Sequence, residues 1–136
     1  MNKTIKYCGI LLVAVFVTTI GIFIYGGETI IESILSATLI LLPMIFSFGV
    51  FYLLSKTGSR FLISASLGVF ITNLLISGVL ALAFTVDVLG KGGLGPAQGY
   101  WLMFTWAGGA KLSMFGIIGG VIFELIRGIR KQAVNK

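Results

Sequence analysis

The sequence predicts an all-α integral membrane protein, a four-helix transmembrane bundle with both termini in the cytoplasm. Two observations predict this class. The 136 residues are 57% hydrophobic and only 10% charged, with a mean hydropathy of +1.09, whereas a soluble domain carries about 25% charged residues. In addition, four apolar stretches each approach the roughly 20 residues that a helix needs to cross a bilayer. We therefore expect residues 1–136 to form a single polytopic membrane domain surrounded mainly by lipid.

Each predicted span is bounded by polar or glycine-containing segments. The four spans are expected at about residues 7–25, 33–54, 61–86 and 108–126. The first follows Lys3 and Lys6, as a secretory signal peptide would. Its apolar core is too long, however, and no small-x-small cleavage site follows it, so we expect a retained helix. Pro43 in the second span should kink that helix and free a backbone carbonyl about one turn earlier.

The basic residues predict the orientation. In a chain that crosses four times, the two termini and the connection between spans two and three share one side. That side carries Lys3, Lys6, Lys56, Arg60, Arg127, Arg130, Lys131 and Lys136, and the opposite side carries Lys91, Glu28, Glu32 and Asp87. Because positive charge is retained in the cytoplasm, this asymmetry predicts cytoplasmic termini. The expected location is the plasma membrane, meaning the inner membrane of a bacterium.

The connections on the outer side are predicted to differ in character. Glu28 and Glu32 would share a face if the second helix begins early, where the helix dipole favours negative charge. The connection at residues 87–106 is long, rich in glycine and partly aromatic. It is either the part recognised outside the membrane or a linker that dips into the lipid headgroups. Trp101 and Trp106 are expected at headgroup level, where amphipathic rings settle.

Polar residues form a stripe on the third span. At 100° per residue, Ser66, Asn73 and Ser77 fall on one face of a helix. Since a bare amide is costly in hydrocarbon, this stripe should face the bundle or a partner chain. Interhelical hydrogen bonding is one interpretation, and a polar translocation path is the other.

The fourth span carries a face of small residues. Gly109, Ser113, Gly116 and Gly120 lie on one side of the predicted helix, and the last two form a GxxxG pair. Such a face lets another helix backbone approach closely, so we predict a helix-packing interface. The packing partner could be any of the first three spans or another protein.

Lys111 interrupts the same span on the face opposite the glycines. It lies about 24 Å from Arg127 along the helix, which leaves about 6 Å of a 30 Å hydrocarbon layer. Three interpretations remain open for this outer-boundary charge. It could extend to the headgroups, form an ion pair with Glu28, Glu32 or Asp87, or contact a substrate or ion.

Several functional classes are excluded by what the sequence lacks. There is no histidine and a single cysteine, Cys8, so an intramolecular disulfide, a histidine-ligated haem and the usual zinc sites are ruled out. Cys8 is interpreted as a packing residue, or else as a lipidated or reactive thiol. Without a catalytic constellation, we predict neither an enzyme nor a cofactor. The basic residues occur singly or in pairs, unlike a nucleic-acid-binding surface.

Two functions fit these features. The first is a helper or binding protein, such as an accessory subunit or an immunity or exclusion protein. It would act on another membrane component through helix packing and its outer connection, with lipid and a membrane-protein partner, or copies of itself, as neighbours. The second is a small oligomeric transporter or channel subunit for an ion or an anionic lipid-linked substrate, with its path lined by the polar stripe.

Overall fold

The computed structural model describes residues 2–56, 59–91 and 101–135, with only the backbone described for residues 87–91. The protein is all-helical, with 93% of residues in helices. Its elements are α1 (Asn2–Tyr25), α2 (Ile30–Leu54), α3 (Arg60–Lys91), a π-helical turn η1 (Phe104–Gly108) and α5 (Gly109–Val134). Among the described residues, four helices are long and apolar enough to cross a membrane, which suggests a membrane protein.

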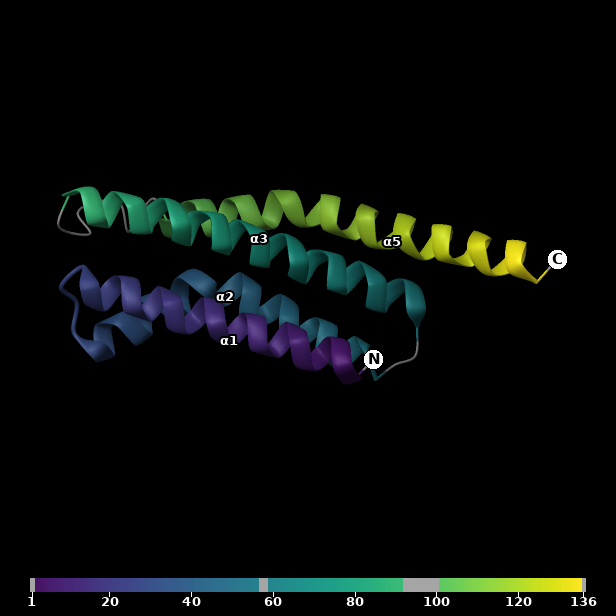
Figure 1. Ribbon diagram of the computed structural model, residues 1–136, viewed down its shortest axis with the longest axis horizontal. Helices are drawn as coiled ribbons and strands as arrows, with labels where there is room; N and C mark the ends of the chain where they lie inside the picture. Colours follow the sequence, from purple (N-terminus) through teal and green to yellow (C-terminus); the bar gives the residue numbers. More distant parts are fainter. Residues whose placement is uncertain (1, 57–58, 92–100, 136) are drawn as a thin grey trace.

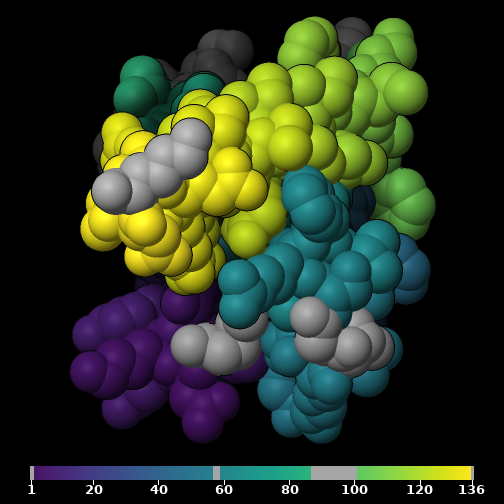
Figure 2. All heavy atoms as spheres, turned by 90° about the vertical axis from the view of Figure 1, so that its right-hand side faces the viewer, coloured from purple at the N-terminus to yellow at the C-terminus, as the bar shows by residue number. Residues whose placement is uncertain are grey.

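The helices run antiparallel to one another in chain order. Figure 1 shows the N-terminus, the turn between α2 and α3, and the C-terminus at one end of the molecule, which we call the terminal end. The turn between α1 and α2 lies at the opposite end. α3 is the central helix, because it packs against α1, α2 and α5, whereas α5 packs mainly on α3. In Figure 2, viewed from the terminal end, α5 crosses obliquely from above α2 to above α1.

The short turn between α1 and α2 is set by local residue chemistry. Gly27 has a φ of 99°, a conformation that side chains disfavour. Thr29 then caps α2: its hydroxyl accepts from the Glu32 N–H, and its own N–H donates to Glu32 Oε2 at 3.0 Å. Glu28 and Glu32 would share a helix face only if α2 began before Glu28, and this condition is not met, since α2 begins at Ile30.

The helices extend beyond the predicted spans, most of all in the second half of the chain. α3 continues to Lys91, and the last helical segment runs from Trp101 to Val134, a length of 34 residues. At 1.5 Å per residue this segment is about 51 Å long, so part of it projects beyond the other helices at the terminal end (Figure 1). Both ends of the predicted connection at 87–106 are thus helical. Its middle, residues 92–100, lies outside the described residues.

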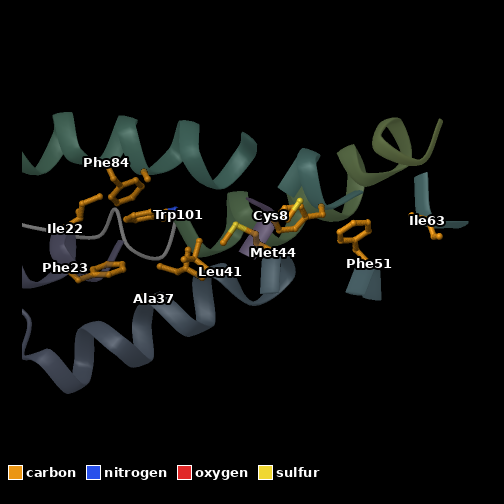
Figure 3. Close-up of a cluster of buried hydrophobic side chains, with 13 residues drawn as sticks. Cys8, Ile22, Phe23, Ala37, Leu41, Met44, Phe51, Ile63, Phe84 and Trp101 are labelled. Carbon is orange, nitrogen blue, oxygen red and sulfur yellow. The ribbon is translucent and has the colours of Figure 1, made fainter. Parts of the chain in front are cut away.

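An aromatic stack joins three helical segments near the α1–α2 turn. The Trp101 ring lies 4.2 Å from the Phe84 ring and 5.3 Å from the Phe23 ring, measured between centroids. Figure 3 shows Trp101 in the buried cluster with these rings and Leu41. Trp101 is fully buried, so its ring is packed within the protein, near the α1–α2 turn. Burying so large a ring against two others stabilises the start of the last segment, which glycine content alone had indicated to be a loop.

Candidate functional site

A close backbone-to-backbone contact joins α3 to α5 at their glycines. A Cβ atom on Gly116 would lie 2.5 Å from the Gly68 carbonyl oxygen and 2.6 Å from Thr72 Oγ1. A Cβ atom on Gly68 would likewise clash with the Gly116 carbonyl group, and one on Gly120 would clash with the Ser64 carbonyl group. Both helices therefore use bare backbone at this crossing, where dispersion acts over the shortest separation.

The small residues predicted as an interface on the last helix all lie toward α3. Gly109 and Gly116 are buried, and Ser113 and Gly120 are half-buried. Gly119, between them in sequence, is exposed, and nothing lies within 4 Å of the position that its Cβ would take. The glycine face is thus occupied within the molecule by α3, which contributes Gly68, a residue that the sequence analysis did not single out.

Asn73 connects α3 to α5 next to the glycine contact. Its Nδ2 donates to the Val69 carbonyl at 3.0 Å and to Ser113 Oγ at 3.3 Å, and Ser113 Oγ donates to the Gly109 carbonyl. A Cβ on Gly109 would lie 2.5 Å from Asn73 Oδ1, so glycine at that position makes room for the amide. Among the described residues, Asn73 Oδ1 is buried without a hydrogen-bond partner.

The other members of the polar stripe make no described hydrogen bond to α5. Ser66 and Ser77 are buried like Asn73. Ser66 Oγ donates to the Ile63 carbonyl of its own helix at 2.9 Å. Ser77 Oγ is buried with no hydrogen-bond partner in the described part of the chain. The three residues therefore share the inward side of α3, but Asn73 alone makes a described interhelical hydrogen bond.

A tryptophan from η1 compensates for the proline in α2. Pro43 has no N–H, so the Leu39 carbonyl loses its helical partner. Trp106 Nε1 donates to this carbonyl at 2.9 Å. The π-helical turn that carries Trp106 contacts both α2 and α3. Sequence reasoning anticipated the freed carbonyl but not its partner, because no spacing rule relates residues 39 and 106.

Among the described side chains, the charges predicted at the outer boundary are not gathered into one site. Lys111 is exposed, and within the described side chains no carboxylate lies at salt-bridge distance from it. Glu32 is engaged in the α2 cap, and the side chain of Asp87 lies outside the described residues. The acidic group that does enter a helix interface is Glu124 near the terminal end. It is buried, accepts from Ser64 Oγ at 3.2 Å and pairs with Arg127 at 3.9 Å.

No group of three or more metal-ligating side chains occurs among the described residues. Cys8 is a buried free thiol in the apolar cluster. The arrangement that remains is one of helix packing: a glycine contact, an amide–hydroxyl hydrogen bond and a tryptophan–carbonyl hydrogen bond, all of which involve α5 or η1.

No family model, curated protein or solved structure matches this chain.

Proposed function

We propose that this chain is a small multi-pass membrane binding protein of the accessory, immunity or exclusion type, which acts by contacting another component of the membrane. The observation that carries the proposal is the use of the intramembrane polar groups. Asn73 and Ser113 bond each other, and Trp106 bonds a backbone carbonyl. These groups are engaged in helix packing within the chain, which favours a function based on contacts over one based on a polar path.

The proposed orientation has both termini in the cytoplasm of a bacterial cell. The terminal end carries Lys56, Arg60, Arg127, Arg130 and Lys131. A cluster of lysines and arginines at one end of a set of apolar helices is the usual mark of the cytoplasmic side. The projecting part of α5 would then enter the cytoplasm.

Because α3 occupies the glycine face of α5, a partner would contact the remaining apolar surfaces. The exposed side chains Val17 on α1, Leu82 on α3 and Phe115 on α5 represent three such surfaces. A membrane-protein partner would replace lipid on one of them, and dispersion and shape would decide which.

Site-specific cross-linking tests the proposal. A photoreactive amino acid replaces Val17, Leu82 or Phe115 in turn, and the tagged protein is cross-linked in cells and purified in mild detergent. We expect one position to yield a single adduct with one other membrane protein, identified by mass spectrometry. Adducts with lipid alone at all three positions would overturn the proposal.

The alternative function is a small oligomeric transporter or channel subunit. The feature that favours it is the buried stripe of Ser66, Asn73 and Ser77 on the central helix. Reconstitution in vesicles distinguishes the two functions. If the purified protein conducts an ion or moves an anionic lipid-linked substrate, and Asn73→Leu abolishes that flux while Ser113→Ala does not, the transporter function replaces the binding function.

A further inference from the structure

A cleft separates α2 from α5 beyond the Trp106–Leu39 hydrogen bond. Its volume is about 580 Å³, within the range of sites that hold small molecules. The apolar part of its lining includes Leu42, Pro43 and Phe46 from α2, Val69 from α3 and Ala110 from α5. Phe46 and Leu42 are exposed, so the cleft opens sideways toward the space that lipid would occupy. We call it the α2–α5 cleft.

The hydroxyl and N–H donors that line the cleft already form hydrogen bonds within the protein. The lining serines Ser47, Ser66 and Ser113 each donate their hydroxyl hydrogen to a carbonyl of their own helix. Asn73 Nδ2 and Trp106 Nε1 also donate to protein acceptors. The oxygen atoms of these side chains can still accept hydrogen bonds. The cleft therefore presents acceptors without a free donor.

The strongest candidate among these acceptors is the side-chain oxygen of Asn73. The residue is 4% exposed, and its Oδ1 has no hydrogen-bond partner among the described residues. This oxygen lies beside Gly109, and Gly109 and Pro43 line the same cleft. Asn73 is about 20 Å along α3 from Arg60, near the middle of a bilayer about 30 Å thick. At that depth water is scarce, and an unpaired amide oxygen is unfavourable.

We propose that the α2–α5 cleft binds an uncharged, lipid-soluble molecule that carries a hydroxyl group, such as a long-chain alcohol. The hydroxyl donates to Asn73 Oδ1, and the hydrocarbon body lies between Phe46 and Ala110. An anion does not suit the cleft, because its described lining holds no lysine or arginine and its lone pairs would repel negative charge. This site goes beyond the proposed binding of a membrane-protein partner and does not depend on it.

Photolabelling in vesicles tests the site. The full-length protein is reconstituted in phosphatidylcholine with a long-chain alcohol that bears a diazirine, and the adducts are located by mass spectrometry. We expect adducts on Leu42, Phe46 or Ala110. The unlabelled alcohol should compete about fivefold better than its methyl ether, the difference expected for one hydrogen bond.

Two matched variants separate the cleft from the general lipid surface. Ala110→Phe fills the cleft and should reduce labelling at least about tenfold, by steric exclusion. Ala107→Phe adds the same ring at an exposed position outside the cleft and should leave labelling unchanged. Equal competition by alcohol and ether, labelling that survives Ala110→Phe, or adducts spread evenly over exposed residues such as Phe115 would each overturn the proposal. Cross-linking to a partner protein is a separate measurement and is unaffected by these outcomes.

Discussion

α5 is close to α3 and separated from α2. Against α3 it presents bare backbone, with Gly116 and Gly68 so close that neither could carry a Cβ atom. Toward α2 the described contact is made by η1, through the Trp106–Leu39 hydrogen bond, and beyond it the two helices enclose a cleft. The last helical segment is therefore closely packed against α3 and separated from α2 by the cleft. Close packing along one helix leaves space beside the next, and that space is where a ligand can enter.

A substitution at the glycine contact between α3 and α5 should have the largest effect on stability. Gly116→Leu forces side-chain atoms into the Gly68 backbone, and we expect a loss of about 3 kcal/mol in the free energy of unfolding. Reversible unfolding in mixed micelles measures it. Gly119→Leu is the matched control, since its Cβ meets no atom within 4 Å. Equal stability of the two variants would show that the α3–α5 contact does not hold the fold.

The second effect concerns the hydrogen bond at the same crossing. Asn73→Leu removes the donor to Ser113 and should lower the free energy of unfolding by about 1 kcal/mol, the usual size for such bonds between membrane helices. Ser66→Ala removes a hydroxyl that bonds only within its own helix, and should cost less. A larger loss for Ser66→Ala than for Asn73→Leu would contradict the assignment of the interhelical bond.

On the open side, a double-mutant cycle tests the tryptophan–carbonyl link. Trp106→Phe leaves the Leu39 carbonyl unpaired in an apolar medium and should lower the free energy of unfolding by about 1 kcal/mol. In the Pro43→Ala background the restored N–H of residue 43 can bond Leu39, so the same substitution should cost less than about 0.5 kcal/mol. Additive effects in the cycle would contradict the compensation of Pro43 by Trp106.

The smallest effect is expected on the face that meets neither neighbour. Lys111 is exposed and has no ion pair among the described side chains, so Lys111→Leu should change the free energy of unfolding by less than about 0.5 kcal/mol. Membrane insertion, measured by protease protection, should be unchanged. A loss comparable with that of Gly116→Leu would mean that Lys111 has a partner beyond the described side chains.

The sequence predicts the helices better than their contacts, for physical reasons. Hydropathy predicts four spans because each helix that crosses a lipid bilayer must by itself be long enough and apolar enough. The small face of α5 follows from spacing within one helix. Gly68, in contrast, is an isolated glycine in α3, and its importance depends on which helix crosses it. Trp101 is a similar case, because its local sequence does not reveal that its ring packs against Phe84 and Phe23.

The π-helical turn η1 has a consequence for what mutations can do to this chain. A π-helix bonds each residue to one five positions away instead of four, so Phe104–Gly108 holds one residue in excess of a regular α-helical turn. Because the turn accommodates that extra residue, deleting one residue there would restore regular α-helical geometry and leave Trp101 and α5 in nearly the same relative orientation. Trp101 would keep its place in the aromatic stack, and the glycine face would stay in place. A single-codon deletion in η1 would thus preserve the inner surface, whereas the same deletion within the regular part of α5 would rotate the residues before it by about 100° relative to those after it.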